Sequence, residues 1–155
     1  MNLITDRTAA DVTRWRQLHD KGWAAMSQEE RDEWLGFMKG RYNREDMNRV
    51  ENAVKSLLSV LHELGYCHST LTFKTDWNRW SVPTRADMTR YLGNVAELRG
   101  CIPLPADTPA APTVATKFNY ARANDVEKIL VNIDKVTTAI PQVWYCAGEL
   151  ISGEV

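Results

Sequence analysis

A run of apolar residues between positions 47 and 64 constrains the fold of this chain more than any other feature of its sequence. Its members are spaced alternately by three and four residues: Met47, Val50, Val54, Leu57, Leu61 and Leu64. This spacing puts them on one face of an α-helix, which Leu58 widens. Asn43 is a suitable N-cap, and Gly65 is a suitable residue just beyond the C-terminus. The pattern predicts an amphipathic helix that needs partners for its apolar face.

Two later segments have the same kind of pattern and supply the expected partners. The first is a helix capped by Thr84, which follows Pro83, and ended by Gly100. Its apolar residues are Met88, Tyr91, Leu92, Val95 and Leu98. The second is expected to start near Asn119, and Pro141 is expected to kink or stop it. Its apolar residues are Val126, Ile129, Leu130, Ile133, Val136 and Ile140.

Two shorter helices are predicted before these three. They span Thr8–Gly22 and Ser27–Gly40, and in each the capping residue is followed three positions later by an acidic residue. The apolar stripes are short: Val12, Trp15 and Leu18 in the first, and Trp34, Leu35 and Met38 in the second. We expect these helices to cover one side or one end of a larger bundle.

The expected fold is therefore all-α: a helical bundle with three amphipathic core helices, two shorter N-terminal helices and a proline-rich crossover segment. Four prolines between residues 101 and 118 exclude a helix there, so this segment is expected to be extended. We expect an up-down-up bundle in residues 1–148 and a C-terminal tail, residues 149–155, with no helical period. The predicted shared core is Met47, Val50, Val54, Leu57, Leu61, Ile129, Ile133 and Val136.

The composition is that of one soluble globular domain, with 155 residues, 44% of them hydrophobic and 25% charged. The net charge is −1, from 19 basic and 20 acidic residues, which argues against a protein that neutralises nucleic-acid phosphates. The first residues contain no apolar stretch of the kind found in a signal peptide, and no run is long enough to span a membrane. We therefore expect synthesis in the cytoplasm and no membrane partner.

The cysteines and histidines are the first candidates for chemistry. Cys67, Cys101 and Cys146 are odd in number and form no CxxC pair, so we expect free thiols and no disulfide. His62, Cys67 and His68 are close in sequence, which raises the possibilities of a zinc site or a cysteine nucleophile. A zinc site needs a second ligand cluster, and the sequence has none. A cysteine nucleophile needs a histidine beside it, but Cys67 and His68 are neighbours in an extended stretch, where successive side chains point to opposite sides. We expect neither metal nor covalent catalysis.

Other catalytic signatures are missing from the sequence as well. It contains no GxGxxG or GxxxxGK[ST] loop that could cradle a phosphate. The acidic pairs Glu29-Glu30 and Asp32-Glu33 fall on a polar helix face, where nothing would raise one pKa for acid–base catalysis. The sequence thus predicts a protein that is not an enzyme and binds no cofactor.

Contacts with a partner are expected at two aromatic residues and at the tail. Trp77 and Trp80 lie between predicted helices, where they either pack the connector onto the bundle or anchor a partner. Leu150, Ile151 and Val155 are apolar residues near the end of the sequence, and such residues suggest docking. We predict that these five residues form a partner-binding site, with strand addition to residues 71–73 as one possible mode.

Four segments resemble a group of small proteins encoded in phage and prophage tail gene clusters. The first is WLGFMKGRYNREDMNRVE, from Trp34 to Glu51. The others are Thr75-Asp76-Trp77, Pro83-Thr84 with the helix after it, and Ala123-Asn124-Asp125-Val126-Glu127-Lys128-Ile129-Leu130. Their order and spacing also match, from about Thr5 to Gly148.

The resemblance implies a bacteriophage virion protein with a structural or assembly role, associated with the tail or baseplate. It implies other phage structural proteins and further copies of the chain as partners, and it transfers no catalytic residue. A different class of function also remains open: a small phage-encoded regulatory or nucleic-acid-associated adaptor, with a helix-turn-helix around Met38-Lys39-Gly40-Arg41.

Overall fold

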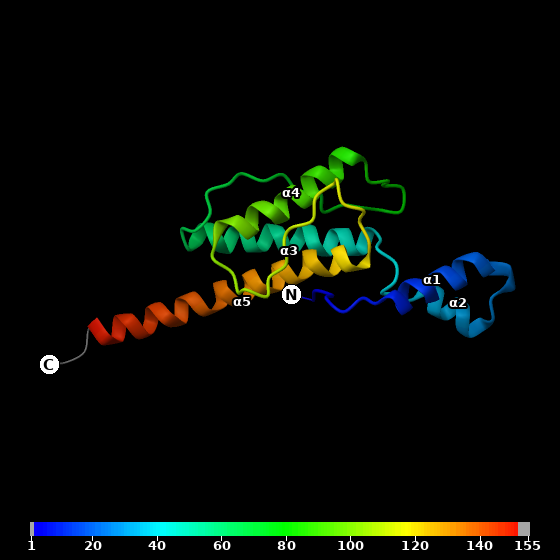
Figure 1. Cartoon of the computed structure of the whole chain (residues 1–155), viewed down its shortest axis with the longest axis horizontal. Coiled ribbons are helices and arrows are strands. Elements are labelled where there is room, and N and C mark those ends of the chain that lie inside the picture. Colours follow the sequence, from blue (N-terminus) through cyan, green and yellow to red (C-terminus); the bar gives the residue numbers. More distant parts are fainter. Residues whose placement is uncertain (1, 152–155) are drawn as a thin grey trace.

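The apolar stripe of residues 47–64 belongs to α3 (Arg44–Glu63), which packs with α4 (Arg85–Cys101) and α5 (Tyr120–Ile151) in a three-helix bundle (Figure 1). This computed structural model describes the backbone of residues 2–151 and the side chains of residues 2–143. Within that range every regular element is a helix, which confirms the all-α bundle expected from the sequence. None of the described helices is long and apolar enough to cross a membrane.

The helices begin at the capping residues that the sequence predicts. The side chain of Asn43 accepts hydrogen bonds from the backbone N–H groups of Glu45 and Asp46 at the start of α3. Thr84 does the same for Asp87 at the start of α4. Gly65 has a φ of 76°, the left-handed conformation in which glycine commonly follows a helix. Local capping chemistry thus sets the ends of these helices.

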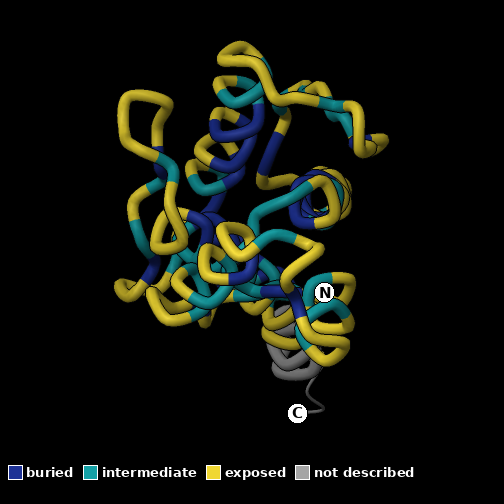
Figure 2. The backbone as a smooth tube through the Cα atoms, turned by 90° about the vertical axis from the view of Figure 1, so that its right-hand side faces the viewer, coloured by how far each residue is buried: buried dark blue, intermediate teal, exposed yellow. Residues whose placement is uncertain are grey.

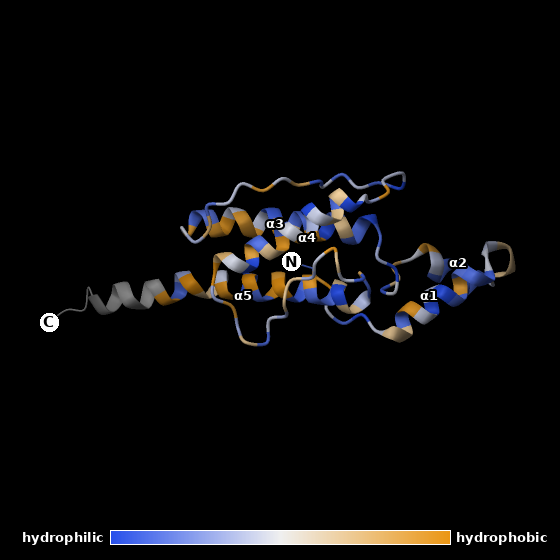
Figure 3. Cartoon of the chain, turned by 45° about the horizontal axis from the view of Figure 1, so that its top comes forward, coloured by the Kyte–Doolittle hydropathy of each residue, from blue (hydrophilic) through white to orange (hydrophobic). Residues whose placement is uncertain are grey.

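The core of the bundle contains the predicted residues. Leu57 is 1% exposed and Ile133 is fully buried, and Val136 packs against the same cluster from a partly buried position. The other five predicted core residues are also buried in it: Met47, Val50, Val54, Leu61 and Ile129. Buried and exposed positions alternate along the bundle helices (Figure 2), and so do hydrophobic and hydrophilic positions (Figure 3). The predicted shared core is confirmed.

The three bundle helices run parallel, so the expected up-down-up order is wrong. Arg49, in the second turn of α3, bonds to Glu127 near the start of α5, and Glu51 bonds to Arg90 near the start of α4. All three helices therefore begin at the same end of the bundle, as Figure 1 shows. The connectors make this possible, because extended segments of about twenty residues reach much farther than the length of a 20-residue helix.

Each connector returns along the outside of the bundle. The backbone carbonyl of Thr72 accepts hydrogen bonds from Asn94 (2.8 Å) and Arg90 (3.1 Å), which ties the first connector to α4. In the proline-rich crossover, Pro109 accepts a hydrogen bond from Arg99 of α4, and Thr108 accepts one from Asn132 of α5. The described part of both connectors contains no strand, including residues 71–73.

Cys67 and Cys101 form a disulfide, contrary to the expectation of free thiols. Their Cα atoms are 5.2 Å apart although 34 positions separate them in the sequence. Cys67 follows the end of α3 and Cys101 is the last residue of α4. Because the two helices are parallel, their C-terminal ends meet; an up-down pair would have kept the cysteines at opposite ends. This bond also removes Cys67 as a candidate nucleophile or zinc ligand.

The two N-terminal helices form an arm that projects from the bundle (Figure 1). The arm comprises α1 (Ala9–Lys21), a short 3-10 helix η1 (Trp23–Ala25) and α2 (Gln28–Leu35). Both α-helices begin with the predicted capping boxes. The arm has an apolar cluster of its own: Leu18, Met26 and Met38, with Trp15 and Trp34 packed against them. It is therefore a small second packing unit at the end of the bundle where α3 starts.

The second arm helix is shorter than expected, because α2 ends at Leu35 and not at Gly40. Gly36 is its C-cap, and the chain then turns so that Gly40 lies against the first turn of α1. A Cβ atom on Gly40 would lie 2.0 Å from the backbone oxygen of Asp11, so only glycine fits there. The early end of α2 leaves Leu35 72% exposed, outside the apolar stripe assigned to it.

Candidate functional site

Among the side chains of residues 2–143, the most exposed large apolar ones lie in three places. On the arm they are Trp23, Leu35 and Phe37, which are 49%, 72% and 54% exposed. In the loop before α4 they are Trp80 and Val82, at 78% and 82%. On α5, beyond the bundle, Val143 is 64% exposed. Exposed apolar groups that cluster are typical of interaction surfaces, so each of these places is a candidate contact site.

The arm is held in shape by pairs of side chains between its two helices. The rings of Trp15 and Trp34 stack with centroids 6.4 Å apart, above the buried Leu18. At the surface, Arg14 bonds to Glu33 with two nitrogens, and Lys21 bonds to Glu30. These hydrogen bonds lower the pKa of both glutamates. The arm therefore presents Leu35 and Phe37 from a fixed helical support.

A pocket of about 390 Å³ opens beside these two residues, where the arm meets the bundle. It is lined by Trp34, Leu35, Gly36, Phe37, Arg41, Asn43, Arg44 and Glu45. The Nε atom of Arg41 is buried and has no hydrogen-bond partner among the described residues. Arg44 is exposed and reaches Glu45 at 3.3 Å. The lining of the pocket thus contains apolar side chains, two arginines and the carboxylate of Glu45. We call it the junction pocket.

The base of the arm is fixed by ion pairs inside the bundle that the sequence reading missed. Arg7 bonds to Asp46 (2.9 Å) and Glu127 (2.7 Å), and Arg49 bonds to the same two carboxylates. Glu127 also accepts a hydrogen bond from the backbone N–H of Ile4. These contacts join the segment before α1 to both α3 and α5. We call the four charged residues the buried ionic cluster.

One feature of the sequence could have predicted a buried ion pair at Glu127. Glu127 falls between Ala123 and Leu130 at helical spacing, so a charged residue interrupts an apolar stripe. Such a residue is expected to have a partner of opposite charge, because an unpaired buried charge is strongly unfavourable. Arg7 supplies it from 120 positions away, a distance that no local pattern reveals.

Two pairs of polar side chains in the bundle interior are bonded to each other. The hydroxyls of Tyr42 and Tyr91 bond to each other, and burial raises the pKa of both. Glu51 is bound by the guanidinium of Arg90 through two hydrogen bonds. Among the described residues, no three His, Cys, Asp or Glu side chains gather as a metal site would require. His62 bonds instead to the backbone oxygen of Ser69.

The two tryptophans of the predicted contact site have different surroundings. Trp77 is 3% exposed and belongs to the bundle core, so it is not available to a partner. The side chain of Asn48 holds its backbone by accepting from the N–H and donating to the carbonyl, both at 2.9 Å. Trp77 therefore packs the connector onto α3. Trp80 is exposed, with the guanidinium of Arg79 4.6 Å from its ring centroid.

The predicted tail residues Leu150 and Ile151 lie in α5, which continues through Pro141 as far as Ile151. The helix therefore includes residues 149–151 of the predicted C-terminal tail. Val155 lies outside the described residues. Because α5 starts beside α3 but has 32 residues against 20, its last part projects beyond the bundle (Figure 1). We call residues 141–151 the α5 extension.

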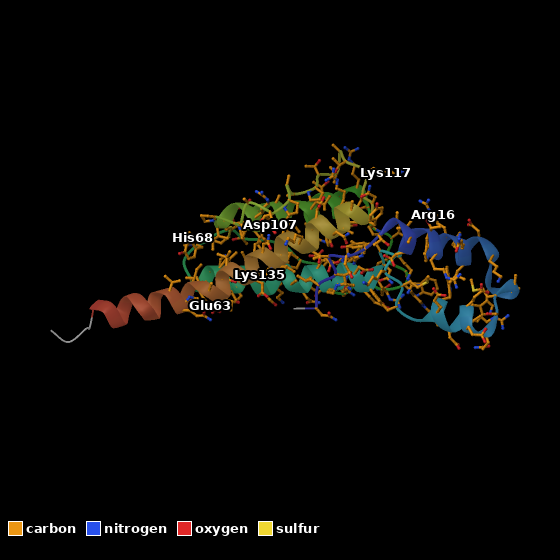
Figure 4. All side chains as sticks on the ribbon, turned by 60° about the horizontal axis from the view of Figure 1, so that its bottom comes forward. Arg16, Glu63, His68, Asp107, Lys117 and Lys135 are labelled. Atoms are coloured by element: carbon orange, nitrogen blue, oxygen red, sulfur yellow. A yellow bond between two sulfur atoms is a disulfide. The ribbon has the colours of Figure 1, made fainter. Side chains whose placement is uncertain are left out.

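The structure does not bring the predicted contact residues together. Trp77 and Trp80 lie at the end where α3 starts, as the bonds from Asn48 to Trp77 show. The α5 extension leaves the opposite end. Figure 4 shows the labelled Glu63 and His68 at that opposite end, and Arg16 on the arm at the other. Among the described residues, Trp77 thus lies at one end of the bundle and the last part of α5 leaves the other end; the contact predicted for the tail itself stays a prediction.

Comparison with protein-family models, with curated proteins and with solved structures finds no match for this chain.

Proposed function

We propose that this chain is a non-enzymatic structural or assembly protein of a phage virion, associated with the tail or baseplate. Synthesis would take place in the host cytoplasm, and the partners would be other phage structural proteins and further copies of the chain. The four segments that resemble phage tail-cluster proteins support this proposal, and they include the stretch from Trp34 to Glu51 that builds the junction pocket.

The observation that carries the proposal is the projecting arm with Leu35 and Phe37 on its surface. Each side chain is more than half exposed, and both flank the junction pocket. Large apolar groups on a rigid, projecting support are suited to insertion into a neighbouring subunit. The interior charges, by contrast, connect helices to one another, so they support a role in holding the fold and not in catalysis.

The adaptor alternative places a helix-turn-helix around residues 38–41. The helix after this turn is α3, whose buried face packs against both α4 and α5. Its exposed face carries Arg44 and Lys55 together with Glu45 and Glu63. This mixture of charges does not favour a nucleic-acid groove, which attracts a predominantly basic surface.

The test is to purify phage particles, or particles from an induced prophage that encodes the chain, and to identify their proteins by mass spectrometry. The chain is expected in tail fractions in a constant ratio to other tail proteins. The double variant Leu35→Ser/Phe37→Ser should be lost from the particles while its helix content and melting temperature stay unchanged. Val60→Ser is the matched control, because Val60 is an exposed apolar residue on the outside of α3.

Two results would overturn the proposal. One is the absence of the chain from every particle fraction although it is expressed. The other is a shift of DNA in a mobility assay that weakens with added salt, which would support the adaptor.

A further inference from the structure

Two exposed surfaces with apolar side chains lie at the same end of the bundle. One is on α2 and in the turn after it, and we call it the arm surface: Glu29, Asp32, Leu35 and Phe37. The other is in the loop before α4 and at the first residue of α4, and we call it the loop surface: Arg79, Trp80, Val82 and Arg85. The arm joins the start of α3 and the loop joins the start of α4, and these two starts lie at one end of the bundle (Figure 1).

The loop surface has a fixed backbone, although its tryptophan lies outside the helices. The backbone N–H of Trp80 donates to the side chain of Asn78 (2.9 Å), and the N–H of Ser81 donates to the carbonyl of Asn78 (3.0 Å). Just before this turn, the buried Trp77 is held on α3 by Asn48. A side chain presented by such a preformed turn binds a partner without the cost of ordering the loop.

Apolar exposure is concentrated on these two surfaces. Among the described side chains, five large apolar ones are more than half exposed, and four of them belong to the arm surface or the loop surface. No described part of the chain covers them. Apolar groups that gather on a surface in this way are typical of an interface with another subunit.

The arm surface carries negative charge. The helix α2 contains four acidic residues and one arginine, and two of the acids are paired with cations of α1. The other two acids, Glu29 and Asp32, form no ion pair with any residue that the structure describes. Three cations near this surface in the sequence already have partners within the chain: Arg31 the ring of Trp23, Lys39 the carboxylate of Asp6, and Arg44 that of Glu45.

The loop surface carries positive charge. Residues 78–85 contain two arginines and no acidic residue. Arg79 and Arg85 are exposed and form no ion pair within the described part of the chain, and the guanidinium of Arg79 lies over the ring of Trp80. Of the two flanking acids, Asp76 is exposed, and Asp87 accepts a hydrogen bond from the backbone at the start of α4. The two surfaces are therefore complementary in charge, and both are apolar.

We propose that two copies of this chain form a two-fold dimer in which the arm surface of each copy contacts the loop surface of the other. Because both surfaces lie at one end of the molecule, one two-fold rotation makes the contact twice and closes the assembly at two subunits. The dimer covers four large apolar side chains of each copy, whereas contact between two arm surfaces would place acids against acids. The proposal rests on the proposed function, because it identifies the neighbouring subunit that the arm contacts.

The first test is sedimentation velocity of the purified full-length protein over a wide range of concentrations. Wild type is expected to change from monomer to dimer as its concentration rises, with nothing larger. Leu35→Ser/Phe37→Ser and Trp80→Ser/Val82→Ser should each raise the dissociation constant by at least about a hundredfold, because each pair of apolar residues is lost from both contacts. The control Val60→Ser, which changes an exposed residue on the outside of α3, should dimerise as wild type does.

Charge reversal gives a sharper test, because it distinguishes contact between copies from a general loss of stability. Glu29→Lys/Asp32→Lys makes the arm surface positive, and Arg79→Glu/Arg85→Glu makes the loop surface negative. Both changes leave the capping boxes of α2 and α4 in place. Each variant alone should be monomeric, because like charges then meet at both contacts. An equimolar mixture of the two should form a dimer, because both contacts then join opposite charges.

Circular dichroism of every variant checks that its helix content is retained. A wild type that stays monomeric at all concentrations would overturn the proposal. So would a folded Trp80→Ser/Val82→Ser variant that dimerises as wild type does, since the loop would then lie outside the interface. A mixture of the two charge-reversed variants that remains monomeric would contradict the pairing of arm with loop.

The two proposals fail separately. A chain that is monomeric in solution but present in purified particles contradicts the dimer alone, and another structural protein would then cover the arm. A chain that forms the expected dimer but occurs in no particle contradicts the virion role alone.

Discussion

The arm and the bundle use the same local signals but are held together by different means. Both begin their helices with capping boxes, at Thr8 and Ser27 in the arm and at Asn43 and Thr84 in the bundle. Among the described residues, the bundle core has 18 buried members, whereas the arm cluster has three. The comparison shows that a capping box sets where a helix starts, while the stability of the helix depends on what it packs against.

The ion pairs of the two regions differ in the same way. The Arg7–Glu127 pair of the bundle is at most 1% exposed, whereas the Arg14–Glu33 pair of the arm is about 40% exposed at both side chains. Solvent screens an exposed pair, and a buried pair cannot lose one member without leaving a charge unpaired. Variants and acid can therefore test whether the two regions depend on their ion pairs and apolar clusters to different extents.

Glu127→Ala is expected to have the largest effect. It leaves Arg7 and Arg49 with a single shared carboxylate, Asp46, in a buried site. Removal of one partner from a buried ion pair costs about 3–5 kcal/mol of unfolding free energy, measured here by urea denaturation. The control is Glu33→Ala, which removes an exposed partner and should shift the midpoint far less. Equal shifts for the two variants would contradict the contrast between the regions.

Leu57→Ala and Leu18→Ala compare the two apolar clusters, because each leucine is 1% exposed. Leu57→Ala creates a cavity in the bundle core and should lower the unfolding free energy by about 2–5 kcal/mol. Leu18→Ala should mainly unfold the arm, so that amide exchange accelerates in residues 9–35 but not in the bundle. If Leu18→Ala lowered the stability of the whole chain as much as Leu57→Ala, the arm and the bundle would be one cooperative unit.

Gly40→Ala tests how closely the arm is fixed to its base. The added Cβ would collide with the backbone of Asp11, so something must move, at a cost of about 1–3 kcal/mol. Gly93→Ala is the opposite control. A Cβ there meets nothing within 4 Å in the middle of α4, and alanine should stabilise that helix by about 0.5–1 kcal/mol. Thermal melts of both variants give the comparison; a stabilised Gly40→Ala would show that the close approach is absent.

As the pH falls, the arm is expected to lose stability before the bundle does. Hydrogen bonds from Thr8, Lys21 and Arg14 hold the pKa values of Asp11, Glu30 and Glu33 below their usual values of 3.8 for Asp and 4.5 for Glu. Their contribution to stability is complete above those usual values and is lost as the pH falls through the lower pKa of the folded state. The effect is small because these side chains are exposed. Amide signals from residues 9–35 should change first as the pH falls below about 4.5.

A single acid transition shared by all residues would contradict this order. Asp11→Asn is a useful control, because asparagine cannot titrate and should remove part of the acid sensitivity of α1.

Local sequence patterns predicted the helices, but they could not predict the direction of the helices or the contacts between distant residues. The capping residues and the stripes of α3, α4 and α5 act within a few residues, so the sequence shows them directly. Helix direction is different, because connectors as long as 64–84 and 102–119 permit either parallel or antiparallel neighbours. Since the direction was not determined, neither was the meeting of Cys67 with Cys101.

The candidate site was predicted only in part, for a similar reason. Trp80 is exposed and Trp77 is buried, although both lie in the same connector and have the same side chain. The difference comes from Asn48, a residue of α3 that no pattern links to Trp77. On the arm, α2 ends at Leu35 and not at the predicted Gly40, and Leu35 faces solvent instead of joining the apolar stripe predicted for it.

The pairing of Arg7 with Glu127 has a consequence for the order in which the chain can fold during synthesis. Arg7 leaves the ribosome 120 residues before its partner Glu127. At a translation rate of about 5–20 residues per second, that interval is on the order of ten seconds. During this time the arm helices can form from their own contacts, whereas the segment that joins them to the bundle has no partner from α5. Arg7 can pair with Asp46 of α3 earlier, but its attachment to α5 must wait until Glu127 has been synthesised.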